Sequence, residues 1–283
     1  MSPEKPLIGF IGQGFIGKNY ADEFEERGFS VIRYALESPY NENKEAIATC
    51  DVVFIAVPTP TTVDGFDDSN LAKVLPLLGK RSSAVIKSTL LPGTTEKLQA
   101  RFPDLFIFHS PEFLREVTAA SDARNPDRNI MGMPVTNSQY EEKAQWLLSL
   151  LPKAPYEKVC TSREAELIKY LGNAFLTTKV IFINMAYDLA EKIGADWGVV
   201  SESFSNDPRI GKSHLNPVHQ SGRGAGGHCF IKDYEALLQY YSQEIGDEKG
   251  VAVFKAIKEK NIDLLKKSNK DIDLLEGVYG NNF

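Results

Sequence analysis

A glycine-rich segment near the start of the chain separates two patterns of different periodicity. Residues 7–11 form a continuous apolar run, and residues 18–27 have the composition of a helix. Between them the sequence reads Gly12-x-Gly14-x-x-Gly17. Glycines at this spacing let a strand turn sharply into a helix that packs closely against it. The chain is therefore expected to begin with a strand–turn–helix unit.

The same alternation of strand and helix continues through the first half of the chain. The expected strands are short and nearly continuous in apolar residues, which is typical of a parallel sheet covered on both faces. We expect strands at residues 7–11, 29–34, 51–57, 83–87, 105–109 and 129–133, and helices at 18–27, 44–49, 71–78, 94–101 and 140–151. The hydroxyls of Thr94 and Thr95 are expected to cap the helix that begins there.

The pattern changes around residues 152–155, and from residue 162 onward no convincing strand is found. Ser162 has the position of an N-cap, with Glu164 in the first turn, for a long apolar-rich helix over residues 162–194. Shorter helices are expected at residues 196–203, 232–241 and 251–267, followed by a frayed tail at 277–283. The predicted fold is α/β: a Rossmann-like, doubly wound parallel sheet in residues 1–157, then an all-helical domain in residues 158–283 built on the long helix.

Composition excludes several classes of partner. The 283 residues carry a net charge of −6, which argues against binding nucleic acid or an anionic membrane. No signal peptide is expected, and the apolar region 174–190 contains charged residues, so we expect a buried helix there and no membrane span. Cys50, Cys160 and Cys229 suit neither a disulfide framework nor a zinc site, so no metal is expected and a cytoplasmic location is favoured.

The first glycine turn is a candidate dinucleotide site. Gly12 permits the tight turn, Gly14 lets a pyrophosphate approach the backbone, and Gly17 lets the helix pack on the strand. The N-terminus of that helix, at Phe15 and Ile16, would face the phosphates. The alternative is a glycine-rich turn without a ligand, which the strand–turn–helix context disfavours.

The end of the second expected strand bears on the choice of dinucleotide. An acidic residue is usual there to hold the ribose 2′-hydroxyl, but Ala35 occupies the position. Glu37, two residues later, can replace it. Arg33 could instead face the 2′-phosphate of NADP, or it could be a solvated strand residue. NAD is preferred over NADP.

A second glycine-rich run, residues 222–227, precedes Cys229. The glycines allow the backbone to come close to a ligand, and a helix after the turn would put Cys229 and Asp233 on one face. This is the arrangement of a nucleophile with a polar assistant. The alternative is a tight turn in which Cys229 is a small buried hydrophobic residue.

Several motifs follow one another along the chain. They are DVVFIAVPTP at residues 51–60, KSTLLPGTT at 87–95, SPEFLRE at 110–116, AELIKYLGNAF at 165–175, RIG at 209–211 and GGHCFIKD at 226–233. Together with the first glycine turn, this ordered set resembles the UDP-glucose/GDP-mannose dehydrogenase family. The resemblance covers nearly the whole chain.

The resemblance implies an NAD-dependent, four-electron oxidation of the C6 alcohol of a nucleotide sugar to a carboxylate. It gives Cys229 the role of the nucleophile that forms a thiohemiacetal and then a thioester. Lys169 and Asn173, which are four residues apart on the long helix, would stabilise the oxyanion. Asp233 with Lys169 would position a water, and Glu112 would be the base in thioester hydrolysis.

The resemblance also implies the binding residues and partners. Glu116 and Thr89 would line the catalytic pocket. The other cofactor contacts would be Glu37, Val57, Pro58, Thr59 and Lys232, and the substrate contacts Phe113, Leu114, Arg115, Arg209, Gly226 and Gly227. A homodimer through the helix at residues 162–194 is expected, because a long apolar helix needs a partner surface. A place in nucleotide-sugar metabolism and polysaccharide biosynthesis is implied.

Each polar residue also has a structural interpretation. Lys169 could extend to the surface, Asn173 could bridge helices, and Glu112 and Glu116 could belong to a solvated face.

Three departures from the family pattern put the substrate in doubt. Ile231 and Ala225 replace a usual proline and a usual aromatic residue, and the segment 34–50 is shorter than usual. The family's second Rossmann-like domain, which holds the nucleotide, is expected to be missing or supplied by another chain. Two alternatives therefore stay open: a two-electron dehydrogenase of a smaller hydroxy acid or sugar phosphate, and a non-catalytic NAD-binding subunit.

Overall fold

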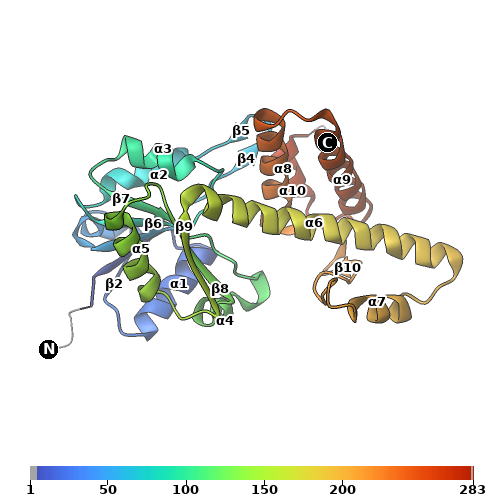
Figure 1. The fold of residues 1–283 in the computed structure, drawn as a ribbon, viewed down its shortest axis with the longest axis horizontal. Coiled ribbons are helices and arrows are strands. Elements are labelled where there is room, and N and C mark those ends of the chain that lie inside the picture. Colours follow the sequence, from blue (N-terminus) through green and yellow to red (C-terminus); the bar gives the residue numbers. More distant parts are fainter. Residues whose placement is uncertain (1–4, 282) are drawn as a thin grey trace. The chain divides into compact units, whose positions relative to one another are not determined.

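The computed structural model describes residues 5–281 and 283, which form two compact units (Figure 1). Of these described residues, the first unit contains 5–59 and 67–169, and the second contains 60–66 and those from 170 onward. The domain boundary expected from the sequence, between residues 157 and 158, falls inside a strand of the first unit. A short segment that precedes most of the first unit in sequence belongs to the second.

The first unit is built on a seven-stranded sheet of order β2-β1-β3-β6-β7-β8-β9. All neighbouring strands are parallel except β7 and β8, which pair antiparallel through His109 and Gly132. The strands are β1 (Ile8–Ile11), β2 (Val31–Tyr34), β3 (Val52–Ile55), β6 (Ser83–Ile86), β7 (Phe106–His109), β8 (Arg128–Met133) and β9 (Tyr156–Thr161). The predicted α/β class is confirmed, and β9 is the strand of this sheet that the sequence did not predict.

Helices cover the sheet and close its core. They are α1 (Phe15–Glu26), α2 (Ser69–Val74), α3 (Thr94–Arg101), α4 (Ala119–Arg124) and α5 (Ser138–Leu150). The helix expected at residues 44–49 consists of two short 3-10 turns, η1 (Tyr40–Asn43) and η2 (Ala46–Thr49), and another, η3 (Leu75–Leu77), follows α2. The rings of Phe10, Phe24 and Phe54 pack together with centroids 5.1–5.6 Å apart, so aromatic contacts fix α1 on the sheet.

The long helix α6 (Ser162–Ile193) begins at the predicted residue and contributes to both units. In the first unit, its buried Glu166 accepts hydrogen bonds from Gly93 N at 2.6 Å and Thr95 N at 2.8 Å. The Thr95 hydroxyl also donates to Glu166, at 2.5 Å. The N-terminus of α3 is therefore capped by a distant carboxylate, and the predicted capping by threonine hydroxyls is wrong.

The second unit is mainly helical. Besides α6 it contains α7 (Trp197–Ser205), α8 (Gly227–Glu244), α9 (Glu248–Lys267) and α10 (Ile272–Tyr279), with hairpins β4–β5 (Thr61–Thr62, Gly65–Phe66) and β10–β11 (Val218–His219, Gly222–Arg223). α8 begins five residues earlier than expected, and α10 occupies part of the segment expected to be frayed. The two-residue hairpin strands were too short to be recognised in the sequence.

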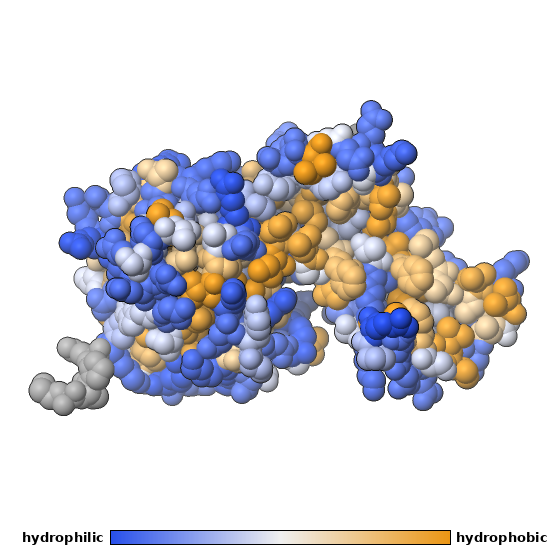
Figure 2. Space-filling model, viewed as in Figure 1, coloured by the Kyte–Doolittle hydropathy of each residue, from blue (hydrophilic) through white to orange (hydrophobic). Residues whose placement is uncertain are grey.

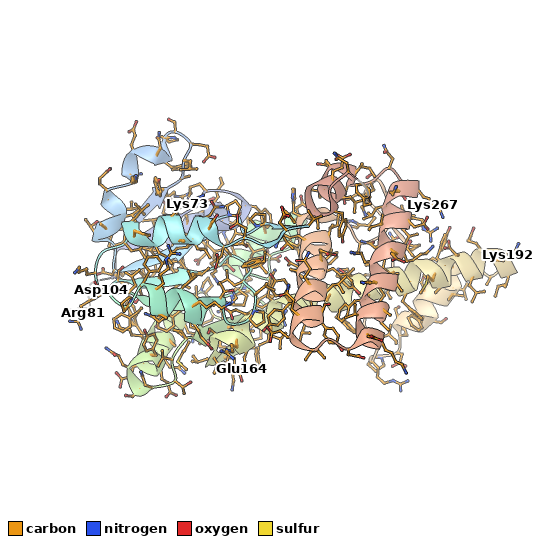
Figure 3. All side chains as sticks on the ribbon, turned by 90° about the horizontal axis from the view of Figure 1, so that it is seen from above. Lys73, Arg81, Asp104, Glu164, Lys192 and Lys267 are labelled. Atoms are coloured by element: carbon orange, nitrogen blue, oxygen red, sulfur yellow. The ribbon has the colours of Figure 1, made fainter. Side chains whose placement is uncertain are left out.

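The helices of the second unit present both apolar and charged side chains at the surface. Figure 2 shows apolar side chains gathered over α6 and α7. In contrast, Lys192 and Lys267, labelled in Figure 3, project from the last turns of α6 and α9, where a cation interacts favourably with the helix dipole.

Within residues 5–281 and 283, none of the helices combines the length and apolar character that crossing a bilayer requires.

The burial of Glu166 predicts that the free energy of unfolding depends on pH. Burial raises its pKa to about 7, although the three hydrogen bonds oppose the shift. A folded-state pKa above the unfolded value means that stability from this group is lost as the pH rises through about 7. Relative to Glu166→Gln, the wild-type free energy of unfolding should fall by about 1–3 kcal/mol between pH 5 and pH 8. Urea unfolding at the two pH values measures this difference, and a constant difference would contradict it.

Candidate active site

The glycine turn after β1 has the geometry of a dinucleotide cradle. Gly12 has φ +90°, and a Cβ there would lie 2.3 Å from the carbonyl oxygen of Ala56. A Cβ on Gly17 would lie 1.8 Å from Gly12 O, so both positions require glycine. Gly14, by contrast, has open space around it and is the N-cap of α1, with Phe15 exposed beside it. An open, uncapped helix N-terminus of this kind fits a pyrophosphate.

The carboxyl ends of β3 and β6 are tied together at the same edge of the sheet. The Ser88 hydroxyl donates to Val57 O at 2.7 Å, and the Thr59 hydroxyl donates to Thr89 O at 2.8 Å. Pro58, between the two anchored residues, is exposed. Three predicted cofactor contacts therefore lie beside Thr89, at the edge where parallel sheets bind ligands.

The residues around the end of β2 favour a dinucleotide without a 2′-phosphate. Arg33 is half-buried, and its guanidinium pairs with Asp22 at 2.7 Å and Glu25 at 2.8 Å. Two carboxylates already neutralise it, so it is a poor partner for a further anion. Glu37 is exposed just past the strand, where the sequence expected a substitute acid.

A buried ion pair joins two of the predicted catalytic residues. Lys169 Nζ lies 2.7 Å from Glu112 Oε1 and also donates to Glu112 O at 2.8 Å. Glu112 Oε2 accepts from Leu114 N at 2.7 Å, and the ring centroid of Phe113 lies 5.8 Å from Lys169 Nζ. Both charged side chains are buried. Glu112 and Lys169 therefore do not belong to a solvated surface.

Lys87, the first residue of the motif at 87–95, is buried, and the sequence alone suggested no role for it. Its Nζ donates to Ser110 Oγ at 2.9 Å and lies 4.5 Å from the ring centroid of Tyr20. Burial lowers its pKa to about 7, although the charge of Glu112 opposes the shift. A lysine directly after a buried strand, at the ligand-binding edge, was the signal that could have identified it.

Two residues of the following loop lie outside this buried cluster. Arg115 is exposed and pairs with Asp122 at 2.5 Å, and this guanidinium is the main reason that the pKa of Asp122 is lowered to about 2. Glu116 is exposed at the start of the turn η4 (Glu116–Thr118).

In the second unit, Asp233 is the centre of a polar cluster. It is fully buried, accepts from Asn173 Nδ2 at 2.6 Å and forms an ion pair with Lys232. Asn173 follows Lys169 by one turn of α6, as their spacing predicted. Lys232, expected to contact the cofactor, thus has a structural partner next to it.

Cys229 is exposed in the first turn of α8, three residues after the N-cap Gly226. Gly227 has φ +78°, with open space where a Cβ would lie. Because a helix N-terminus favours nearby negative charge, this location suits a thiolate. Cys50 and Cys160 contrast with it, since burial raises the pKa of each thiol to about 11.

Arg209, a predicted substrate contact, is exposed and pairs with Asp207 at 2.6 Å. Its charge is therefore neutralised locally.

The parallel sheet with its glycine cradle defines an NAD-binding dehydrogenase fold. Residues 36–149 match the NAD-binding domain of the UDP-glucose/GDP-mannose dehydrogenase family, and residues 163–262 match the central domain of that family. The chain belongs to the UDP-glucose/GDP-mannose dehydrogenase family, and its cofactor is NAD.

Individual relatives agree with this assignment. The chain is 31% identical over 282 residues to UDP-glucose 6-dehydrogenase AglM of Haloferax volcanii, covering 82% of this chain and 64% of the relative. It is 34% identical over 236 residues to a UDP-glucose 6-dehydrogenase of Rickettsia prowazekii, covering 78% and 53%. A UDP-glucose dehydrogenase structure from Pyrobaculum islandicum superposes with a TM-score of 0.81 at 29% identity, covering 97% and 71%. The chain thus spans about half to two thirds of its curated relatives.

The buried ion pair generates a prediction about stability. Lys169→Met leaves Glu112 buried without its ammonium partner and should lower the free energy of unfolding by about 3–5 kcal/mol. The double variant Glu112→Gln, Lys169→Met should be less destabilised than Lys169→Met alone, because no unpaired charge remains. Urea unfolding at pH 7 measures both.

The matched control is Lys153→Met, which removes an exposed partner of Glu157 in the same unit and should change little. A double variant that loses as much stability as the sum of its two single variants would show that the pair is not coupled.

Proposed function

We propose that the chain carries the oxidising centre of a nucleotide-sugar dehydrogenase, which converts the C6 alcohol of a UDP-glucose-type substrate to a carboxylate. The observation that carries the proposal is Cys229, exposed at the N-terminus of α8 behind a glycine turn. Family membership supports the substrate class. The glycine cradle would hold NAD, which would supply the hydride acceptor for each of two oxidations.

The proposed covalent chemistry takes place on Cys229. Its thiolate adds to the carbon of the aldehyde produced by the first oxidation, and the aldehyde oxygen takes up a proton to give a thiohemiacetal. Loss of a hydride and the hydroxyl proton converts the thiohemiacetal to a thioester. Water then attacks the thioester carbon, releasing the carboxylate and restoring the thiol. The covalent bond keeps the aldehyde from escaping between the two oxidations.

The remaining polar residues are proposed to stabilise charge and move protons. Asn173 can donate its amide hydrogen to a developing oxyanion, and the Lys169 ammonium can stabilise the same negative charge. Asp233 and Glu112 are proposed to hold water, with Glu112 as the base in hydrolysis. Support comes from their burial, since a desolvated carboxylate with fixed partners is pre-oriented for proton transfer.

Further residues are proposed to bind the ligands. For NAD they are those of the glycine cradle with Glu37, Val57, Pro58, Thr59, Thr89 and Lys232, and for the sugar they are Phe113, Leu114, Arg115, Glu116, Arg209, Gly226 and Gly227.

The function is tested by incubating the chain with NAD and UDP-glucose and counting NADH, by its absorbance, per sugar consumed. We expect about two NADH per sugar, because oxidation of an alcohol to an acid removes two hydride equivalents. Cys229→Ser should reduce acid formation on the order of a thousandfold, because serine at this position lacks a stabilised anion.

Cys160→Ser is the control, since that thiol is half-buried and has a raised pKa, and it should leave the rate unchanged. One NADH per substrate, insensitive to Cys229→Ser, would instead favour a two-electron dehydrogenase of a smaller alcohol. Binding of NAD without turnover of any nucleotide sugar would favour a non-catalytic subunit.

We also propose that the chain forms a homodimer through α6. Phe182, Met185, Leu189 and Ile193 are exposed, and their spacing of three and four residues places them on one face of the helix. Exposed apolar side chains of α7 continue the apolar surface seen in Figure 2. Contiguous apolar surface of this kind marks an interaction site.

The dimer proposal predicts that Phe182→Glu combined with Met185→Glu halves the mass measured by light scattering. Each glutamate would place a charge in an apolar interface, where it has no partner. Glu191→Lys, on the opposite face of the helix, should leave the mass unchanged. A monomeric wild-type chain would refute the proposal.

A further inference from the structure

The glycine turn that precedes Cys229 is hydrogen-bonded at several of its residues to α9 and to the segment that follows α9. Arg223 N donates to Ser268 Oγ at 2.9 Å, Lys270 Nζ donates to Gly224 O at 3.2 Å, and Gly227 N donates to Asp271 Oδ2 at 2.8 Å. Residues of the segment that follows α9 therefore fix the backbone of the turn.

Asn261 of α9 makes the most specific of these contacts. Its Oδ1 accepts from Ala225 N at 2.7 Å, and its Nδ2 donates to Ala225 O at 2.9 Å. Asn261 is 5% exposed and Ala225 is 2% exposed, so water cannot replace either bond. One amide side chain thus satisfies both backbone groups of one turn residue and fixes its orientation.

Close packing also restricts which residues this turn can contain. A Cβ on Gly226 would lie 1.9 Å from Asp271 Oδ2, and one on Gly222 would lie 2.4 Å from the Ser268 Cβ. Gly224 has φ +89°. These glycines are therefore required for packing against the residues after α9, in addition to any approach to a ligand.

Two departures from the family pattern also find a physical reason in this packing. Ala225 is buried, with 2% of its surface exposed, so an aromatic side chain there would have to displace its neighbours. Ile231, two residues after Cys229, is 1% exposed and packs with Leu265, Leu275 and Val278 of α9 and α10. The isoleucine links the first turns of α8 to α9 and α10.

We propose that Asn261 is a positioning residue for Cys229. By holding both backbone groups of Ala225, it fixes the turn whose end is the first turn of α8, and so places the Cys229 thiol at the helix N-terminus. The proposal rests on the proposed role of Cys229 as the nucleophile. Asn261 acts through the backbone and does not itself contact the substrate.

The test measures the rate at which iodoacetamide alkylates Cys229 in the full chain between pH 5 and pH 10, quantified by peptide mass spectrometry. Only the thiolate reacts, so the midpoint of the profile reports how strongly its surroundings stabilise the anion. Asn261→Leu keeps the volume but removes both bonds to Ala225. We expect its midpoint to rise by about half a unit to one unit, because the thiol loses its fixed place at the helix N-terminus.

Two further variants make the outcome decisive. Phe254→Leu removes ring contacts with Tyr234 and Tyr241 of α8, away from the turn, and should lower the melting temperature without moving the midpoint. Asn261→Ser, a milder change, should move the midpoint in the same direction if Asn261→Leu does not fold. An Asn261 profile that overlays that of the wild type, or an equal shift in Phe254→Leu, would overturn the proposal.

Alkylation needs neither NAD nor a sugar, so the result does not depend on turnover. A shifted midpoint in a chain that oxidises no nucleotide sugar would support the positioning role while refuting the proposed function. Turnover of UDP-glucose together with an unshifted midpoint would refute the positioning role alone.

Discussion

Parallel pairing of the first strands is the constraint on which the first unit depends. Because β1, β3, β6 and β7 run in the same direction, each connection must return across a face of the sheet, and all four carboxyl ends meet at one edge. The glycine cradle, the segment before the β4–β5 hairpin, Thr89 and the Glu112 loop all follow these ends. Residues dispersed over a hundred positions thereby become one surface.

Carboxylates are buried in both units, and three of them have partners within their own unit. Glu112 has Lys169 and a backbone amide, Glu166 has the N-terminus of α3, and Asp233 has Asn173 and Lys232. Unpaired, any of these carboxylates would cost several kcal/mol of stability. Their partners explain how α6 can be both apolar enough to pack and rich in functional side chains.

The sequence predicted the centre of the sheet well because β1 and β3 are buried and lack polar side chains. It missed β9, an edge strand whose residues are exposed or half-buried, so that no continuous apolar run marks it. It placed the start of α8 too late because Gly227 and the residues after it are poor helix formers. The true start depends on Asp271, 44 residues away in the chain, which no local pattern reveals.

The parts of the candidate site that lie in a sequence motif could be predicted. The parts that depend on long-range contacts could not. Spacing alone predicted that Lys169 and Asn173 would be one turn apart, and the glycines predicted the cradle. The partners of Glu112 and Asp233, the lowered pKa of Lys87 and the role proposed for Asn261 depend on contacts between segments far apart in sequence. These contacts follow from the packing of the helices and strands, which the sequence does not state.

The hairpin β4–β5 gives the chain an unusual order of assembly. Residues 60–66 lie between two parts of the first unit in sequence but pack with α8 and α10 of the second. During synthesis this segment therefore emerges long before the helices that will cover it. The polypeptide crosses between the units after residues 59, 66 and 169, so no single cut separates them into two complete pieces. The second unit cannot be completed until the C-terminal helices have been synthesised. Its first two strands, by contrast, are joined in sequence to the first unit on both sides.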